Sequence, residues 1–241
     1  MNSRVLPWRA RTVPVILTRM LKKAWKNKPL WSIFGSFVVA MLLWNTPVIY
    51  PLKVLVVFFH EISHGLVALL GGATDITITL SANEGGRAWA KGGSYFLMAN
   101  AGYLGSLLWG SALVLSSSYT KRDRFLTSIL GLVLAYVTLR YVRNGFGFGF
   151  GLASSAGLLA AGKYLPNEAN DFLLKVIGTT SMGYAVLDVW SDIMIRSCQS
   201  DATILANMTG IPPVVWGGLW IVLSLAGIYG TLVLASRIHR A

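Results

Sequence analysis

The stretch Pro51–Leu70 is almost wholly apolar, yet it carries the sequence His-Glu-Ile-Ser-His at its centre. A run of this length and composition is typical of a helix that spans a membrane. Ionisable groups inside such a helix are costly, and they indicate a functional site. We therefore expect the chain to fold as a membrane-spanning bundle built around a few buried polar side chains.

The spacing of these polar residues indicates a metal site. His60 and His64 are four positions apart, so a helix places both imidazoles on one face, where they can bind one zinc ion. Glu61 lies beside the first of them and is positioned to act as a general base on a metal-bound water. The remaining histidine, His239, is at the C-terminal end, and Cys198 is the only cysteine, so no thiol-rich site exists. Two buried histidines hydrogen-bonded to neighbouring helices are the alternative interpretation.

The composition predicts a polytopic membrane protein. Hydrophobic residues make up 54% of the chain and charged residues 12%, whereas a soluble domain has about 25% charged residues. We expect an all-α polytopic membrane protein with about six to seven transmembrane helices and a small β-hairpin after the motif helix. A basic segment, residues 1–29, precedes the integral membrane domain, residues 30–241.

The distribution of charge predicts how the chain lies in the membrane. Eight of the 21 basic residues fall within the first 28 positions, with no acidic residue among them. The positive-inside rule then predicts a cytoplasmic N-terminus in contact with anionic lipid headgroups, and a plasma (inner) membrane is our expectation. No basic surface with interleaved aromatic residues recurs, so we expect no nucleic-acid partner. Seven spans would leave Lys121, Arg122 and Arg124 outside, unless one segment is a half-span.

The first span is expected over Leu30–Ile49, ahead of the motif helix. Directly after that helix, Thr74–Leu80 alternates β-branched residues strictly, which predicts a strand, and Asn83–Gly86 predicts a turn. A hairpin is our interpretation, and a plain interhelical loop is the alternative. A strand beside the metal can hold an extended peptide by strand addition, which assigns substrate binding to Thr77, Ile78 and Thr79. Two G-x-x-x-G pairs within Gly145–Gly151 predict helix packing, with a locally unwound helix as the alternative.

A third metal ligand is required, because catalytic zinc usually has three protein ligands and one water. With histidine and cysteine excluded, it must be a carboxylate, and the chain has nine acidic residues. Asp188 has the best depth, inside an apolar span. Asp192 lies one helical turn further along that span. Asp201 follows it, where a short capped helix can fold back toward the metal.

Two stretches of the sequence resemble the site-2 protease family of intramembrane zinc metallopeptidases, closest to its compact branch without regulatory domains. The first covers roughly Val54–Gly110, with the His-Glu-Ile-Ser-His motif, the double glycine, the β segment and the AGYLGS span. The second covers Ser200–Gly217 and begins with Ser-Asp-Ala. The family takes its third ligand from an aspartate of a late helix, and the Ser-Asp-Ala match implies Asp201. Asp188 is the alternative, in a Leu-Asp-Val context that lacks the glycine of better-studied members.

The resemblance also implies a substrate and a mechanism. The expected reaction is hydrolysis of a peptide bond in or next to a transmembrane segment of a membrane-protein substrate, with Zn²⁺ as cofactor. Asn100 lies in the span after the hairpin, where an asparagine of the family orients a substrate carbonyl, although this chain reads ANAGY in place of glycine-proline followed by asparagine. Bridging two helices is the other role for Asn100. A catalytically inactive membrane scaffold that retains a metal site is the main rival, and a transporter is the second.

Overall fold

The computed structural model describes residues 28–194 and 200–237, so most of the basic N-terminal segment, Cys198 and His239 lie outside the described residues. Within this part the chain forms eight helices and a two-stranded antiparallel sheet. The bounds are α2 (Lys28–Leu42), α3 (Tyr50–Leu70), β1 (Thr74–Leu80), β2 (Gly86–Lys91), α4 (Tyr95–Tyr119), α5 (Asp123–Tyr141), α6 (Gly145–Tyr164), α7 (Asn167–Met194), α8 (Asp201–Thr209) and α9 (Pro213–Ser236). The expected helical bundle and the hairpin after the motif helix are both confirmed.

Six of the helices, α3 to α7 and α9, are long and apolar enough to cross a membrane. The expected first span, Leu30–Ile49, is wrong in extent, because α2 has 15 residues and ends at Leu42. Turns follow, in which the Thr46 amide donates to the Leu43 carbonyl at 2.8 Å. Pro47 accounts for part of this break, since proline lacks an amide hydrogen and disfavours helical geometry in the residue before it, whereas Pro51 is accommodated in the first turn of α3.

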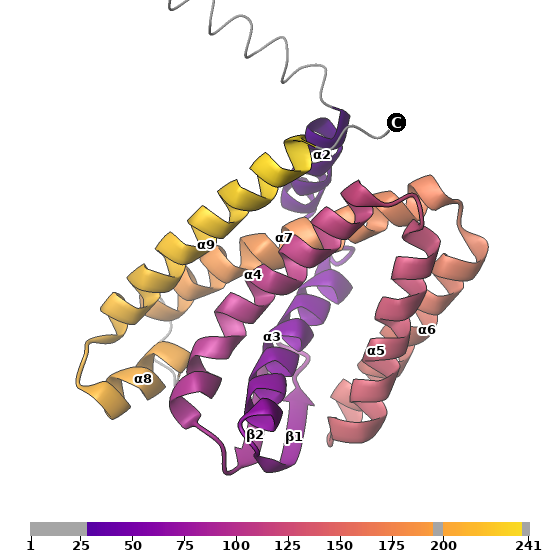
Figure 1. Cartoon of the computed structure of the whole chain (residues 1–241). Helices are drawn as coiled ribbons and strands as arrows, with labels where there is room; N and C mark the ends of the chain where they lie inside the picture. The colour runs from indigo at the N-terminus through magenta and orange to yellow at the C-terminus, as the bar shows by residue number, and fades with distance from the viewer. Residues whose placement is uncertain (1–27, 195–199, 238–241) are drawn as a thin grey trace, which may run out of the picture.

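The bundle is organised around α4, which packs against α3, α7 and α9, while α5 and α6 form an antiparallel pair at one side (Figure 1). On α3, Phe59 stacks on Trp109 of α4 with ring centroids 5.3 Å apart. Phe58 and Val54 belong to the largest cluster of buried apolar residues, which also includes Leu134 of α5 and Leu174 of α7. The motif helix is therefore surrounded by other spans, and its central residues are buried.

The start of α2, the end of α9 and the α4–α5 and α6–α7 connections lie at the end of the bundle drawn at the top of Figure 1. Ile33 of α2, Val114 of α4 and Ala235 of α9 pack in one cluster there, and Arg124 Nε of α5 donates to the Gly162 carbonyl of α6 at 3.0 Å. Helices α2 and α3 follow one another toward the opposite end, where the hairpin, α8 and the α5–α6 connection lie (Figure 1). The basic residues at the first end include Lys121, Arg122, Arg124, Lys163 and Arg237.

The hairpin folds back alongside α3. Tyr50, at the start of α3, donates its hydroxyl to the Ala82 carbonyl in the turn at 2.7 Å. Lys53 forms an ion pair with Glu84 of the same turn at 3.4 Å. Both strands therefore run beside the motif helix for much of its length, and the buried Ile76 side chain lies against Gly65 of α3.

The two edges of the sheet have different neighbours. On the outer edge of β1, Ile78 forms a parallel bridge with Val142, and its carbonyl accepts from the Arg143 amide at 3.0 Å. The Asn144 side chain then accepts from the Leu80 amide at 3.1 Å and donates to the Leu80 carbonyl at 2.7 Å. The α5–α6 connection thus covers this edge. Among the described residues, β2 has no strand partner other than β1.

Of the two G-x-x-x-G pairs of α6, Gly147/Gly151 packs the helix as expected, whereas Gly145/Gly149 does not. A Cβ on Gly147 would lie 2.6 Å from Asn144 Oδ1, and one on Gly151 would lie 2.8 Å from Thr138 Cγ2, so this face needs glycine. A Cβ on Gly149 would meet no atom within 4 Å. The helix is continuous from Gly145 to Tyr164, and the alternative of an unwound segment is wrong.

Candidate metal and catalytic site

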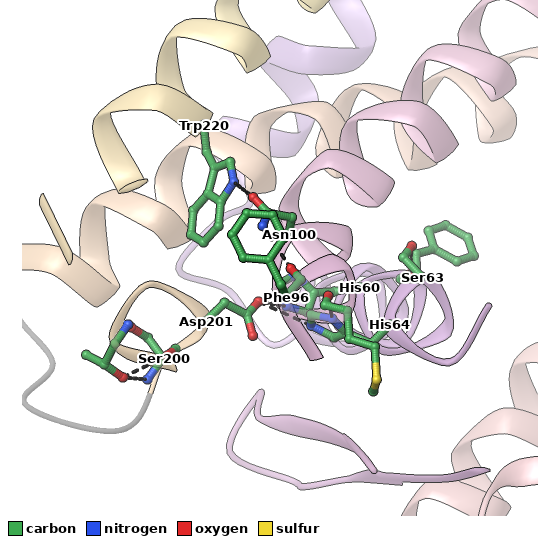
Figure 2. A network of polar contacts seen from close by, with 11 residues as sticks. His60, Ser63, His64, Phe96, Asn100, Ser200, Asp201 and Trp220 are labelled. Carbon is green, nitrogen blue, oxygen red and sulfur yellow. Dashed lines mark hydrogen bonds and ion pairs between the residues drawn. The ribbon is translucent and has the colours of Figure 1, made fainter. Parts of the chain in front are cut away.

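Three side chains that could bind a metal, from two distant parts of the sequence, meet at one point (Figure 2). His60 Nε2 lies 3.1 Å from Asp201 Oδ2, and His64 Nε2 lies 3.2 Å from the same oxygen. One donor atom from each residue falls within 4.8 Å of the others. The i, i+4 spacing aligns the two imidazoles on α3, as the sequence predicts, and α8 delivers the carboxylate.

The short helix α8 brings Asp201 to this point. Ser200 and Thr203 form a capping box, in which each backbone amide donates to the side-chain oxygen of the other residue. The helix therefore begins at Asp201. Ala202 and Leu205 are buried in a cluster with Tyr103 of α4 and Trp220 of α9, which fixes the orientation of α8. The first residue of α8 therefore projects toward α3.

The charge state of Asp201 suits a ligand. Burial alone would raise the pKa of its carboxyl group, but the charge interaction with His64 and hydrogen bonds from both imidazoles hold that pKa below its ordinary value. A metal-binding carboxylate must be ionised. The surroundings of Asp201 therefore favour its ligand form.

The histidine rings are held by contacts behind them. His64 donates from Nδ1 to the Met98 carbonyl at 2.6 Å, which leaves Nε2 as the ring nitrogen directed at Asp201 and available to a metal. The Nδ1 atom of His60 is buried and has no hydrogen-bond partner among the described residues. The Tyr103 ring meets the His60 ring edge-on at 4.7 Å, and Tyr184 contacts it from α7. Packing thus fixes His60, and packing with a hydrogen bond fixes His64.

Two glycines of α4 allow the helix to approach the motif so closely. A Cβ on Gly102 would collide with the His60 ring and would lie 2.6 Å from His64 Nε2. A Cβ on Gly105 would collide with the Ser63 side chain. The absence of side chains at these two positions leaves room for the imidazoles and for a bound ion between α3 and α4.

Glu61 faces the hairpin. Its carboxylate contacts the Ala88 backbone amide, and a Cβ on Gly86 would lie 2.6 Å from Glu61 Oε1. The side chain of Glu61 belongs to a buried residue, 5% exposed. Because the Ala88 amide points at α3, this part of β2 turns its free edge toward the site.

A cleft of about 420 Å³ surrounds these groups. Its walls are formed by α3, the free edge of β2, the start of α4, α7 and α8. The residues include His60, Glu61, His64, Gly86, Arg87, Ala88, Trp89, Ala90, Tyr103, Tyr184, Asp188 and Asp201. The cleft runs along β2, so an extended chain placed there would pass the three metal-binding side chains.

The other predicted site residues occupy different positions. Asp188 lines the cleft, but the cluster of candidate metal donors among the described residues consists of His60, His64 and Asp201. The side chain of Asp192 lies outside the described part. Asn100 joins α4 to α9: its Nδ2 donates to the Phe96 carbonyl at 2.9 Å and its Oδ1 accepts from Trp220 Nε1 at 3.2 Å (Figure 2). Asn100 is not among the residues that line the cleft.

Thr77, Ile78 and Thr79 lie in β1, between the α5–α6 connection and β2, where Ile78 pairs with Ala88. Sequence reasoning assigned peptide binding to this first strand and not to β2, although both edges of β1 have neighbours in the structure. It also missed Gly86 and the Met98 carbonyl. The turn sequence around Gly86 was visible as a signal, whereas a backbone carbonyl leaves none in a sequence.

The three donors fit a zinc ion by their chemistry. Two imidazole nitrogens and one carboxylate oxygen supply the three nitrogen and oxygen ligands typical of a catalytic zinc site. The hydrogen bond behind His64 selects the tautomer that a metal needs. Gly102 keeps the space between the rings open.

Comparison with known proteins agrees with the site and the fold. A family profile described as Peptidase M50B-like matches residues 33–231, which include every residue of the site. No curated protein and no solved structure matches the chain. The matched region covers most of the chain and contains the six apolar spans except for the end of α9. The chain is therefore a multi-pass integral membrane protein that belongs to the Peptidase M50B-like family, the site-2 protease family of membrane metallopeptidases.

Proposed function

We propose that this protein is an intramembrane zinc metalloprotease that hydrolyses a peptide bond in or next to a transmembrane segment of a membrane-protein substrate. One observation carries the proposal: His60, His64 and Asp201 converge at a cleft inside a membrane-spanning bundle, with Glu61 beside them. A carboxylate adjacent to three such donors is the arrangement that metal-assisted hydrolysis needs.

His60, His64 and Asp201 would hold the zinc ion. Zinc, when bound, supplies a water of lowered pKa and polarises the carbonyl of the scissile bond. The Met98 carbonyl keeps the His64 ring in its ligand tautomer, and the capped start of α8 holds Asp201 in place. These contacts leave little freedom for the donors to move.

Glu61 acts as the general base and then as the general acid. Its carboxylate accepts a proton from the attacking water and passes that proton to the leaving amine as the C–N bond breaks. The contact with Ala88 and the close approach of Gly86 hold the carboxylate at the wall of the cleft. Tyr103 and Tyr184 pack against His60 and limit the water that reaches it.

The substrate binds in extended form along β2. A helical segment hides its carbonyls in hydrogen bonds within the helix, so it must unwind before it can be cut. The strand whose edge is free is β2, whereas the outer edge of β1 already contacts Val142, Arg143 and Asn144. We therefore assign strand addition to β2, and Thr77, Ile78 and Thr79 act as the strand behind it.

The metal content of purified protein tests the site. Wild-type protein in detergent is expected to contain about one zinc per chain by atomic absorption. His64→Ala and Asp201→Ala are expected to lose it, since each removes one of three ligands. Asp188→Ala serves as the matched control, because it removes a cleft carboxylate outside the donor cluster. Zinc lost from Asp188→Ala and kept in Asp201→Ala would overturn the ligand assignment.

The same measurement, joined to a cleavage assay, separates a protease from a scaffold. A scaffold that retains its metal would contain zinc and cut no membrane substrate. Well-folded wild-type protein that takes up no zinc, even when zinc is added back, would contradict the protease.

We propose a membrane orientation from the loops that share one end of the bundle. We assign a plasma membrane and a cytoplasmic N-terminus, because the start of α2 and the basic loops at residues 119–123 and 163–166 share one end, and the positive-inside rule places that end in the cytoplasm. Helices α2 and α3 then make one crossing together. With one crossing fewer, Lys121, Arg122 and Arg124 lie on the cytoplasmic side, as the positive-inside rule requires.

Thiol labelling of intact cells tests this orientation in a Cys198→Ser background. Ile211→Cys, in the α8–α9 connection, should react with a membrane-impermeant maleimide added outside, and Thr120→Cys should react only after lysis. The reverse pattern would show that the orientation is inverted.

A further inference from the structure

The outward face of β2 carries a pattern that none of the proposed chemistry uses. Ala88 and Ala90 turn toward α3, where Ala90 is fully buried. The alternation of a strand then places Arg87, Trp89 and Lys91 together on the opposite face. Arg87 and Lys91 are exposed, and Trp89 is 50% exposed. A cation, an aromatic ring and a second cation thus follow one another at every second residue.

These two cations lack acidic partners. Among the described residues, neither Arg87 nor Lys91 forms an ion pair, and of the hairpin's two acidic residues Glu84 pairs with Lys53. The other, Asp75, sits in the irregular part of β1, where the register shifts between Thr74 and Thr77. Across the sheet, Thr79 and Thr77 lie opposite Arg87 and Trp89 and add no charge. Among the described residues this face therefore carries two cations that form no ion pair, and Asp75 is the one acidic residue near it that is not paired with Lys53.

This face continues into the cleft, since Arg87 and Trp89 also line it. A peptide added to the free edge of β2 would place alternate side chains beside Arg87, Trp89 and Lys91, at the separation of cross-strand neighbours, about 5 Å. Opposite charges at such positions stabilise the pairing and like charges oppose it. The edge of β2 would therefore bind the backbone of an added chain, and the outward face would select the charge of its side chains.

We propose that Arg87, Trp89 and Lys91 select substrates whose unwound segment carries two acidic residues four positions apart, with an apolar residue midway between them. This proposal rests on the proposed function, because it needs the substrate to lie along β2. The pattern is identical in both directions of reading, so it holds for parallel and for antiparallel addition. The acidic residues fit the flank of a transmembrane segment, where the chain leaves the apolar core.

Peptide binding to the full-length Glu61→Gln variant tests the proposal without any cleavage. The probes are fluorescent twelve-residue peptides rich in valine and threonine, with two glutamates, two glutamines or two lysines at positions i and i+4. Fluorescence anisotropy in neutral detergent is expected to show the glutamate peptide binding roughly tenfold more tightly than the lysine peptide. A glutamate peptide with spacing i, i+3 places the charges on opposite faces and should lose most of this advantage.

A charge exchange gives the sharper comparison. Arg87→Glu combined with Lys91→Glu should reverse the preference, so that the lysine peptide binds best. The matched control, Lys121→Glu with Arg122→Glu at the opposite end of the bundle, should leave the preference unchanged. Equal binding of all three peptides to the parent protein would overturn the proposal.

Two further results separate this proposal from its alternatives. Ala88→Pro removes an edge amide together with its contact to the side chain at position 61, and a proline is tolerated at an edge position of this kind, so it should weaken all peptides alike. Unchanged binding in Ala88→Pro, with the charge preference intact, would refute strand addition but keep the selecting face. If the peptides bind equally and the Arg87→Glu, Lys91→Glu variant instead loses co-purified phosphatidylglycerol, the face binds lipid headgroups and the proposal fails.

Discussion

Glu61→Gln will abolish cleavage of a single-span membrane substrate while the protein keeps its zinc. The substitution preserves the size of the side chain and its place against Gly86 and Ala88, but an amide cannot accept the proton of the attacking water. Removal of a general base costs about 10²- to 10⁴-fold in rate. The three donors that would hold the metal are untouched, so zinc per chain should equal that of the wild type.

A second carboxylate of the same cleft provides the control. Glu84 also lines the cleft, but it pairs with Lys53 in the hairpin turn. Its side chain is 38% exposed, and an exposed ion pair contributes little, so Glu84→Gln should change the rate by less than about tenfold. Wild-type cleavage by Glu61→Gln, measured by gel analysis of reconstituted enzyme and substrate, would refute the mechanism.

Gly102→Ala will strip the metal from the protein by a steric effect alone. The added methyl group would collide with the His60 ring and lie 2.6 Å from His64 Nε2, and α4 has no room to retreat because it packs against α7 and α9 on its other sides. Overpacking of this kind typically costs about 1–3 kcal/mol of stability. Zinc occupancy and the temperature of thermal unfolding in detergent should both fall.

The matched variant is Gly149→Ala on α6, where an added Cβ meets no atom within 4 Å. It makes the same chemical change in another membrane helix and should leave zinc content and thermal unfolding at wild-type values. Full zinc occupancy in Gly102→Ala would show that α3 and α4 are further apart than the structure has them.

Local patterns predict much of this protein because they depend on neighbours in the sequence. The i, i+4 spacing puts His60 and His64 on one helix face whatever surrounds that helix. The strict alternation of Thr74–Leu80 likewise specifies a strand from its own residues. Both features depend on periods that are set by backbone geometry.

The third candidate metal donor, Asp201, could not be predicted from local sequence patterns. Depth in an apolar span favoured Asp188, but the structure brings Asp201 to the histidines across 141 positions of sequence, through a short capped helix held by Leu205. Its place depends on packing against α4 and α9, which no local period encodes. The resemblance to a known family, and not the physics of the residues, selected Asp201.

Which strand of the hairpin has a free edge also depends on packing between distant segments. Nothing in Thr74–Leu80 reveals that residues 142–144 will cover its outer edge, because those residues lie two helices later. Gly102 belongs to the AGYLGS span, which the sequence shows. The partners of its close approach, the two imidazoles, became visible only in the folded chain.

The length of β2 has a mechanical consequence for whatever it binds. A strand rises about 3.3 Å per residue and a helix 1.5 Å, so six residues that leave a helix to match the six of β2 lengthen by about 11 Å. The rest of the bound chain must shift to supply this extra length. A segment unwinding at the middle of a span would have to push its remaining turns out of the bilayer, whereas one unwinding near its end can draw in loose residues from the aqueous side. If β2 binds the substrate as proposed, the hairpin therefore favours cleavage near the ends of spans over cleavage at their centres.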